Sequence, residues 1–524
     1  MAEAVRGIGG LTVYSLFRSQ AYQRPAALAI EWQGRPWSYS ALLDASDRLA
    51  TQLRKFGIRT GDRVAIVSEN RIEYTLLQLA SARIGAIVAC LNWRLTVEEL
   101  RYCFNLAEPK ILFFSARFHE IAHELGIDAC QMLALDACLD AIKSLPVDTG
   151  PPAEDPELGL LLLYTSGTTG LPKAALISQR AEIARMTVLR MDLNIGPDDA
   201  YLAWSPMFHM GGTEHTLASL MFGACVIITD GLDLKAMADA LSRFQLGWLL
   251  LVPSTIEPLL NEMKRRETVV RGVKVVGCMA DLVPPALIAR VTRTFGAPFL
   301  NSFGATETGL PPATGHLIPV GSIPGDLSKR LSSLCEFRLV DSAGHEVADG
   351  AVGEGIMRGP TLFSGYWNAP EATSRVLRDG WFHMGDLFRR TENNGYEFAG
   401  RSKYLIKSGG ENIYPAEIER VLLQDPRIAD AAVVKKADPK WGEIPVAFIA
   451  PAIDGLTEQD IETLCRSRLA GYKRPREVHF IALEQLPRST TGKILREELE
   501  RRLQRPADAI INATEPGVEH VSEL

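Results

Sequence analysis

Tyr164-Thr165-Ser166-Gly167-Thr168-Thr169-Gly170-Leu171-Pro172-Lys173 follows directly on an apolar run, Leu158 to Leu163, that is typical of a buried strand. The two glycines let the backbone turn its N–H groups toward an anion, because no Cβ stands in the way. The hydroxyl groups of Thr165, Ser166, Thr168 and Thr169 add donors, and Lys173 adds a mobile positive charge. The stretch therefore predicts a loop that binds phosphate.

Two other structures have a similar composition. The common nucleotide loop G-x-x-x-x-G-K-[ST] does not match, since Pro172 stands where its second glycine belongs and Ala174 where its hydroxyl belongs. An ordinary hairpin turn is the alternative, because clusters of Ser, Thr and Gly between strands usually form one. Ten residues in this order are too many for a turn alone, so we favour the phosphate loop.

The composition is that of a globular protein with more than one domain. The chain has 524 residues, 47% hydrophobic and 23% charged, and a formal net charge of -7 with both signs interspersed. This pattern does not favour a nucleic-acid partner. The eight cysteines form no C-x-x-C pair and predict free thiols in a reducing compartment. Because the chain shows neither a signal pattern nor an apolar run long enough to span a membrane, we expect a cytoplasmic protein.

Helical and strand-like segments alternate along most of the chain. The amphipathic stretch from Tyr39 to Phe56 predicts a helix, and the spacing of Thr96 and Glu99 predicts a capping box at the start of another. The alternation continues after the phosphate loop, with a strand expected at Trp248 to Val252. Glycines between short apolar pieces from Phe337 to Met357 predict a β-rich subdomain. The whole pattern indicates a layered α/β fold.

The texture of the sequence changes near residue 400, where a compact module of alternating helices and strands begins. We therefore expect a large domain over residues 1–400 and a small domain over residues 401–505. The polar residues 506–524 are expected to form a tail.

The phosphate loop resembles the signature loop of the adenylate-forming superfamily, which includes acyl-CoA synthetases, firefly-type luciferases and the adenylation domains of nonribosomal peptide synthetases. Further motifs extend the resemblance over nearly all of residues 10 to 500. The resemblance implies an α/β protein whose large N-terminal domain has layered α/β sheets and a β-rich subdomain. It also implies a small, mobile C-terminal α+β domain. The loop residues Thr165 to Gly170, together with Lys173, would hold the phosphates of ATP.

Asn301-Ser302-Phe303-Gly304-Ala305-Thr306-Glu307-Thr308 resembles the second core motif of the superfamily. Taken alone, a Thr-Glu pair in a loop is more often a helix N-cap than a catalytic element. The resemblance implies that Thr306 lies at the α-phosphate and that Glu307 holds Mg²⁺, a hard cation that prefers oxygen ligands. It further implies that the adenine is walled by Asn301, Ser302, Phe303 and Gly304.

Two more motifs complete the expected nucleotide site. Gly380-Trp381-Phe382-His383-Met384-Gly385-Asp386-Leu387 could be a plain turn carrying one acid, but it resembles the motif whose aspartate, here Asp386, binds the ribose hydroxyls. Arg401 matches the arginine that contacts the ribose or the phosphate. Lys493, in Pro487-Arg488-Ser489-Thr490-Thr491-Gly492-Lys493-Ile494, would otherwise be one exposed lysine among many. By resemblance it reaches the α-phosphate and carboxylate oxygens in the first half-reaction.

The remaining assignments concern the acyl group, the hinge and coenzyme A. His209 could be a core histidine, but it resembles the gate between the carboxylate site and the thiol tunnel. Lys403 falls on the hinge position of the superfamily. The residues that resemble the groups meeting coenzyme A are Ser408, Gly409, Gly410, Trp441, Lys473 and Arg474.

These motifs imply an ATP-dependent acyl-CoA synthetase, an AMP-forming acid–thiol ligase that uses ATP, Mg²⁺ and coenzyme A. Apolar residues such as Met210 and Leu310 favour a hydrophobic monocarboxylic acid, with a medium- or long-chain fatty acid first, and Gly211 and Gly212 are expected to leave space in the acyl pocket. Glu214 fits either a buried polar residue or a contact to a polar substituent. The alternatives are an aromatic or alicyclic acid, a carrier protein as acceptor, or a non-catalytic nucleotide-binding protein. A homodimer stays open.

Overall fold

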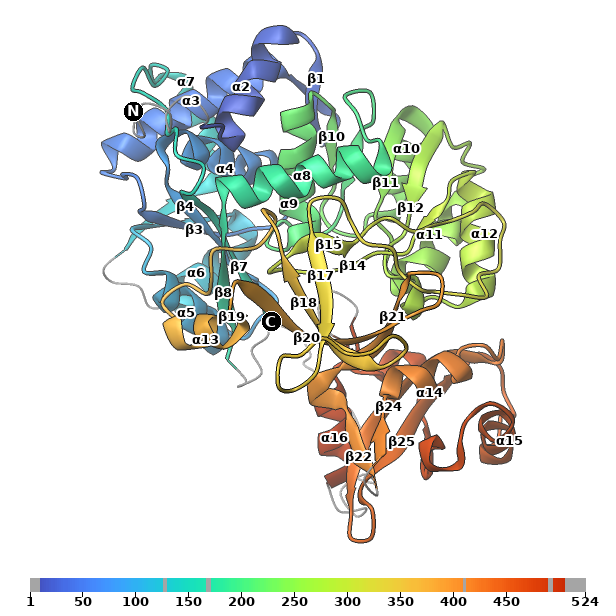
Figure 1. The fold of residues 1–524 in the computed structure, drawn as a ribbon. Coiled ribbons are helices and arrows are strands. Elements are labelled where there is room, and N and C mark those ends of the chain that lie inside the picture. Colours follow the sequence, from blue (N-terminus) through green and yellow to red (C-terminus); the bar gives the residue numbers. More distant parts are fainter. Residues whose placement is uncertain (1–9, 126–129, 166–170, 409–410, 489–492, 505–524) are drawn as a thin grey trace, which may run out of the picture. The chain divides into compact units, whose positions relative to one another are not determined.

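The computed structural model describes residues 10–125, 130–165, 171–408, 411–488 and 493–504 (Figure 1). Its contacts divide the chain into two compact units, the first made of Met1–Met384 and Phe388–Glu397 and the second of Gly385–Leu387 and Phe398–Leu524. Each unit has its own sheets and its own hydrophobic cores. Among the described residues, we find no helix long and apolar enough to cross a membrane.

The largest sheet of the first unit has six strands in the order β6-β5-β3-β4-β7-β8, all parallel except the β7–β8 pair. Its strands are β3 (Arg63–Val67), β4 (Ile87–Cys90), β5 (Ile111–Phe114), β6 (Gln131–Ala134), β7 (Gly159–Thr165) and β8 (Lys173–Ser178). Its helices are α3 (Tyr39–Lys55), α4 (Ile72–Ile84), α5 (Val97–Ala107), α6 (His119–Glu124) and α7 (Cys138–Lys143). Val64 and Ile66 pack into the core with α3 and α4, whereas Ala65 and Val67 pack with α5 and α6. Both faces of the sheet are therefore covered, as a parallel sheet requires.

Local sequence signals account for several helix boundaries. The predicted helix from Tyr39 is confirmed as α3, which begins after the cap residue Ser38. The predicted capping box is also confirmed, because Thr96 Oγ1 accepts from the backbone N–H of Glu99 at 3.3 Å and Glu99 Oε2 accepts from the N–H of Thr96 at 2.9 Å. The predicted strand from Trp248 to Val252 was placed too late, since Pro253 begins the next helix and Val252 is its cap.

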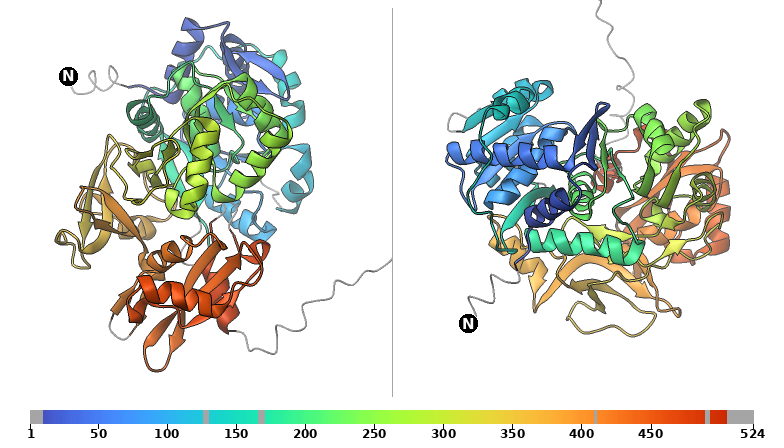
Figure 2. Two further views of the ribbon diagram at one scale, coloured as in Figure 1. Left: turned by 90° about the vertical axis from the view of Figure 1, so that its right-hand side faces the viewer. Right: turned by 90° about the horizontal axis from the view of Figure 1, so that it is seen from above.

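Two four-stranded sheets follow, in the orders β2-β1-β10-β9 and β11-β12-β13-β16. Their strands are β1 (Leu28–Trp32), β2 (Arg35–Ser38), β9 (Tyr201–Ala203), β10 (Val226–Ile228), β11 (Gln245–Leu249), β12 (Gly272–Val276), β13 (Phe299–Leu300) and β16 (Leu317–Ile318). The helices of this part are α2 (Val13–Gln23), α8 (Gln179–Leu193), α9 (Met210–Phe222), α10 (Leu234–Arg243), α11 (Pro253–Arg265) and α12 (Pro285–Phe295). Helices α10 to α12 lie together beside β11 and β12 (Figures 1 and 2). Helix α9 packs against α2 and α8 and is buried almost all round.

The strands β14 (Phe303–Ala305) and β15 (Gly309–Ala313) form a small hairpin. The β-rich segment predicted from Phe337 to Met357 belongs to a further antiparallel sheet in the order β17-β18-β20-β19. The strands on that path are β17 (Glu336–Val340), β18 (Val352–Arg358), β20 (Trp381–Arg390) and β19 (Leu377–Arg378), and the fifth strand, β21 (Tyr396–Arg401), also pairs with β20. Helix α13 spans Pro370–Val376. Strand β21 carries the chain from the first unit into the second.

The second unit is built on one sheet in the order β23-β22-β25-β24, with β26 also paired to β25. Its strands are β22 (Ile406–Ser408), β23 (Glu411–Ile413), β24 (Ile428–Asp438), β25 (Gly442–Pro451) and β26 (Glu477–Phe480). Its helices are α14 (Pro415–Leu422), α15 (Glu458–Arg468) and α16 (Arg496–Gln504). Ala431 and Val433 of β24 pack with α14 and α15, while Ala432 and Val434 pack with α16. The alternation of side chains along one strand thus gives the sheet two apolar faces, one covered by α14 and α15 and the other by α16.

Candidate active site

The predicted phosphate loop connects two neighbouring antiparallel strands. Thr165 is the last residue of β7 and Lys173 the first of β8, and the two face each other in the ladder. The predicted phosphate ligands Ser166, Gly167, Thr168, Thr169 and Gly170 lie outside the described residues. The ammonium of Lys173 lies 5.0 Å from the centre of the Tyr366 ring. The strands therefore fix both ends of the loop and place its lysine beside an aromatic residue.

Thr306 and Glu307 occupy the turn between β14 and β15, and both are half-buried. The Tyr366 hydroxyl donates to Glu307 Oε1 at 2.7 Å, and the backbone N–H of Phe363 donates to the carbonyl oxygen of Glu307 at 2.9 Å. Tyr366 thus contacts both Lys173 and Glu307, two predicted site residues that are far apart in the sequence. The sequence motifs did not identify Tyr366. In the structure it follows Gly365, whose φ of 111° is a conformation that favours glycine.

The oxygen donors of this turn fit the Mg²⁺ ion that the superfamily implies. Glu307 offers a carboxylate and Thr306 a hydroxyl, which are ligands that a hard cation prefers. Among the described residues, no group of three or more His, Cys, Asp or Glu side chains could hold a metal ion. A single carboxylate such as that of Glu307 can serve, because proteins usually bind Mg²⁺ through one or two carboxylates together with nucleotide phosphates and water.

Replacing Tyr366 with phenylalanine should lower kcat/KM for MgATP about 10- to 100-fold, since a hydrogen bond to a charged group contributes roughly 1.5–3 kcal/mol. The magnesium concentration needed for half-maximal activity should rise with it. Tyr39→Phe is the control, because the Tyr39 hydroxyl donates to the carbonyl of Ala224 at 2.8 Å in the core. An unchanged magnesium dependence in Tyr366→Phe would mean that the bond to Glu307 has no functional role.

The motif Asn301 to Gly304 is held by internal contacts. The side-chain amide of Asn301 donates to the carbonyl of Leu327 at 2.8 Å, and its oxygen accepts from the Lys329 ammonium at 2.6 Å. The Phe303 ring packs edge-on against Phe388, with centroids 4.9 Å apart. Internal contacts therefore hold the side chains of Asn301 and Phe303 in place.

His209 caps the N-terminus of α9, where its Nδ1 accepts from the backbone N–H of Gly211 at 3.3 Å. The expectation that Gly211 and Gly212 leave space in an acyl pocket is wrong for Gly212. A Cβ at Gly212 would lie 2.4 Å from the carbonyl oxygens of Ser205 and Pro206. The glycine is needed because the start of the helix touches the preceding backbone.

Gly212→Ala should therefore lower the free energy of unfolding by about 1–3 kcal/mol, the usual effect of overpacking in an interior. Gly325→Ala is the matched control, because a Cβ there would meet nothing within 4 Å. Thermal unfolding of both variants checks this expectation. Equal melting temperatures would contradict the close approach at Gly212.

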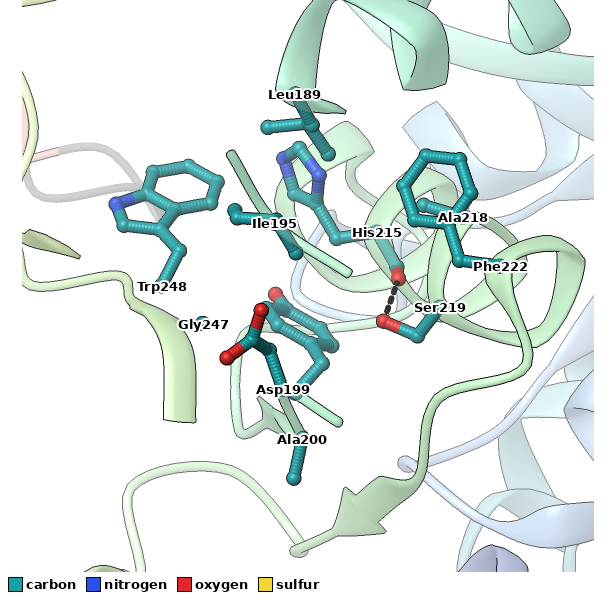
Figure 3. Close-up of a pocket in the computed structure, with 11 residues that line it drawn as sticks. Leu189, Ile195, Asp199, Ala200, His215, Ala218, Ser219, Phe222, Gly247 and Trp248 are labelled. Carbon is teal, nitrogen blue, oxygen red and sulfur yellow. Dashed lines mark hydrogen bonds between the residues drawn. The ribbon is translucent and has the colours of Figure 1, made fainter. Parts of the chain in front are cut away.

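An interior cavity of about 10 Å³ is lined in part by residues of α9 (Figure 3). It is lined by Leu189, Ile195, Asp199, Ala200, Tyr201, His215, Ala218, Ser219, Phe222, Gly247 and Trp248. Burial, with the nearby His209 and Arg185, lowers the pKa of His215 to about 3, so its imidazole is neutral. The cavity has room for about one water molecule and contains no predicted site residue, so it is not a site for a carboxylic acid.

Asp386 and Arg401, the two predicted ribose contacts, lie together within the second unit. Arg401 Nε donates to Asp386 Oδ1 at 2.8 Å, and the aspartate side chain is 1% exposed while the arginine is 44% exposed. The exposed part of the guanidinium can still reach a ligand.

The predicted catalytic and hinge lysines also belong to the second unit. Lys493 is exposed and lies just before α16. The ammonium of Lys403 donates to Glu497 Oε1 at 2.8 Å, and the Tyr404 hydroxyl donates to the same oxygen at 2.8 Å. The hinge position is therefore tied to the helix that follows Lys493.

The predicted coenzyme A residues divide into exposed and internally paired groups. Trp441 lies at the turn between β24 and β25 and is 40% exposed, with Lys440 and Arg476 at 4.8 and 5.9 Å from its ring. Ser408 is buried, and Gly409 and Gly410 lie outside the described residues. Lys473 donates to both carboxylate oxygens of Glu417 at 2.7 and 2.9 Å, and Arg474 Nε donates to the carbonyl of Leu469 at 3.1 Å. Arg476, which the motifs did not identify, lies 5.9 Å from the centre of the exposed Trp441 ring.

Known proteins resemble the chain in sequence and fold. Residues 17–367 match the family model of an AMP-binding enzyme, and residues 417–493 match that of the AMP-binding enzyme C-terminal domain. An indoleacetate–CoA ligase of Aromatoleum aromaticum is 35% identical, over 92% of this chain and 96% of its own length. A feruloyl-CoA synthase of an Amycolatopsis species is 33% identical, over 92% and 97%. The o-succinylbenzoate CoA synthetase of Bacillus subtilis, solved with its acyl-adenylate intermediate, superposes with a TM-score of 0.79 and 25% identity, over 94% of this chain and 98% of that one. The same enzyme has been solved with ATP and a magnesium ion.

Proposed function

Because the chain belongs to the adenylate-forming family of AMP-binding enzymes and is an AMP-forming acid–CoA ligase, we propose that its acid is a hydrophobic aromatic monocarboxylic acid. The observation that carries the adenylating part is the grouping of Lys173, Tyr366 and Glu307. In this grouping the lysine at the end of the predicted phosphate loop and the carboxylate that we assign to Mg²⁺ both contact Tyr366. The choice of an aromatic acid is supported by relatives that act on indoleacetate and ferulate.

The proposed chemistry has two steps. A carboxylate oxygen of the acid attacks the α-phosphorus of ATP, and the bond to pyrophosphate breaks. The thiol sulfur of coenzyme A then attacks the acyl carbon, the bond to AMP breaks, and the thiol proton is lost to solvent. We assign Lys173 and the loop amides to the phosphates, Thr306 to the α-phosphate, and Glu307 to Mg²⁺, which neutralises phosphate charge when bound. Lys493 offsets the repulsion between the two anions that meet in the first step, and His209 borders the acyl site.

We also assign roles to residues of the second unit. Asp386 and Arg401 would contact the ribose, and the exposed Trp441, flanked by two cations, would stack on the adenine of coenzyme A. Eight free cysteines fit a reducing, cytoplasmic setting.

A panel of acids tests the substrate. Indoleacetate, ferulate, benzoate, cyclohexanecarboxylate, octanoate and dodecanoate are compared by acid-dependent exchange of pyrophosphate into ATP, followed by thioester formation with coenzyme A or with a phosphopantetheinylated carrier protein. We expect the highest kcat/KM for an aromatic acid with coenzyme A. A higher kcat/KM for dodecanoate would mean that the acid is a fatty acid. Faster thioester formation with the carrier protein would mean that the carrier protein, and not coenzyme A, is the acceptor.

A further inference from the structure

A buried charge cluster lies between α8 and α9, outside the residues that the sequence motifs identified. Glu182 and Arg185 of α8 and Glu214 of α9 are all at most 1% exposed. Arg185 Nη1 donates to Glu214 Oε1. Glu214, whose role the sequence left open, is therefore half of a buried ion pair and needs no substituent of a substrate to balance it.

The cluster contains two carboxyl groups and one guanidinium. Neither carboxyl oxygen of Glu182 has a hydrogen-bond partner. Burial and the nearby charge of Glu214 raise the pKa of Glu182 well above its usual value, whereas Arg185 offsets part of the rise that burial causes in the pKa of Glu214. Burial and the charge of Glu214 therefore favour the neutral form of Glu182, whereas the hydrogen bond from Arg185 favours the ionised form of Glu214.

The remaining donors of Arg185 reach two segments of the proposed active site. Its Nη2 donates to the carbonyl oxygen of Thr306 at 3.0 Å, and its Nε donates to the carbonyl oxygen of Thr361 at 2.9 Å. Its methylene groups lie over Gly309, where an added Cβ would be 2.7 Å from Arg185 Cγ and Cδ. One guanidinium thus joins α9, the turn that presents Thr306 and Glu307, and the segment leading to Tyr366.

We propose that Arg185, held in place by Glu214, is a positioning residue that fixes the turn carrying Thr306 and Glu307 for adenylation, an inference that rests on the function proposed above. The planar fork of an arginine can donate to three acceptors that lie in different directions. A lysine in its place keeps the charge that Glu214 needs but cannot hold both backbone carbonyls. Misplacement of catalytic groups by about 1 Å can lower a rate by roughly 100-fold.

The test compares Arg185→Lys and Glu214→Gln with the control Glu182→Gln. The control residue is equally buried on α8, and glutamine has the shape of its protonated side chain. Exchange of pyrophosphate gives kcat and KM for MgATP and for the acid, and a supplied acyl-adenylate isolates the thioester step. Arg185→Lys should lower kcat/KM for MgATP about 100-fold and Glu214→Gln about 10-fold, with the KM for the acid and the thioester step within about 2-fold of wild type. Glu182→Gln should behave as wild type.

Two results would overturn the proposal. A raised KM for the acid with unchanged MgATP kinetics would make Arg185 a substrate contact, and equal losses in both half-reactions that follow a lower melting temperature would make it a packing residue. If Arg185→Lys does not fold, Glu214→Gln decides by the same criteria. If the wild type exchanges pyrophosphate with no acid, the proposed function fails. Calorimetric binding of MgATP to the wild type and the variants then tests the positioning role separately. Equal affinities for MgATP would contradict the positioning role of Arg185.

Discussion

Lys493→Ala is expected to slow acyl-adenylate formation by about 1000-fold while leaving thioester formation from a supplied acyl-adenylate near the wild-type rate. The reason is that the acid and the α-phosphate are both anions. At an effective dielectric constant of about 20, two charges about 4 Å apart interact by roughly 4 kcal/mol, which corresponds to about three powers of ten in rate. A lysine whose charge matters only while these anions meet should affect the first step alone.

Separate assays of the two half-reactions check this prediction. Release of pyrophosphate reports the first, and acyl-CoA formed from synthetic acyl-adenylate reports the second. Lys235→Ala, at an exposed position of α10, is the control for loss of a surface charge. Equal losses of rate in both half-reactions would contradict a role of Lys493 in acyl-adenylate formation alone.

Lys403→Pro is expected to keep adenylation and to slow thioester formation by about 100-fold or more. The resemblance implies that the small domain changes orientation between the steps, and such hinges absorb large changes of φ and ψ in a few residues. Proline fixes φ near about −65° and removes an N–H, so it should hold one orientation.

The side chain of Lys403 supplies the control. Lys403→Ala removes the ammonium that pairs with Glu497 but keeps the backbone free to rotate. Pyrophosphate release and acyl-CoA formation are timed in single-turnover experiments on both variants. If Lys403→Ala loses the thioester step as fully as Lys403→Pro, the pairing with Glu497 and not the hinge is responsible. If both rates fall together in Lys403→Pro, the hinge lies elsewhere.

The family and the α/β fold could be predicted from the sequence because their signals are local. The phosphate loop between Tyr164 and Lys173 follows its strand directly, and its prediction of an adenylate-forming enzyme is confirmed by the family models and relatives. The capping box at Thr96 needs only four consecutive residues, and it too is confirmed. The resemblance to acyl-CoA synthetases predicts the ligase class, which is confirmed, but it does not determine the acid: the sequence favours a fatty acid, whereas the relatives named above are an indoleacetate–CoA ligase and a feruloyl-CoA synthase.

The supports of the site could not be predicted in this way because they are tertiary contacts. Tyr366 meets Glu307 across 59 positions, and Arg185 meets the carbonyl of Thr306 across 121. Nothing near Arg185 in the sequence distinguishes it from a surface arginine. The expectation that Gly212 leaves space is wrong for the same reason, since the sequence does not show that a Cβ there would meet the carbonyl oxygens of Ser205 and Pro206.

The destination of a carboxylate oxygen tests the two-step reaction most directly. The acid is labelled with ¹⁸O in its carboxylate and converted to its thioester with ATP, magnesium and coenzyme A, and the nucleotide product is examined by mass spectrometry. Attack on the α-phosphorus followed by cleavage of the acyl carbon–oxygen bond predicts AMP that carries one labelled oxygen. Unlabelled AMP, or ADP together with labelled inorganic phosphate, would contradict an acyl-adenylate intermediate.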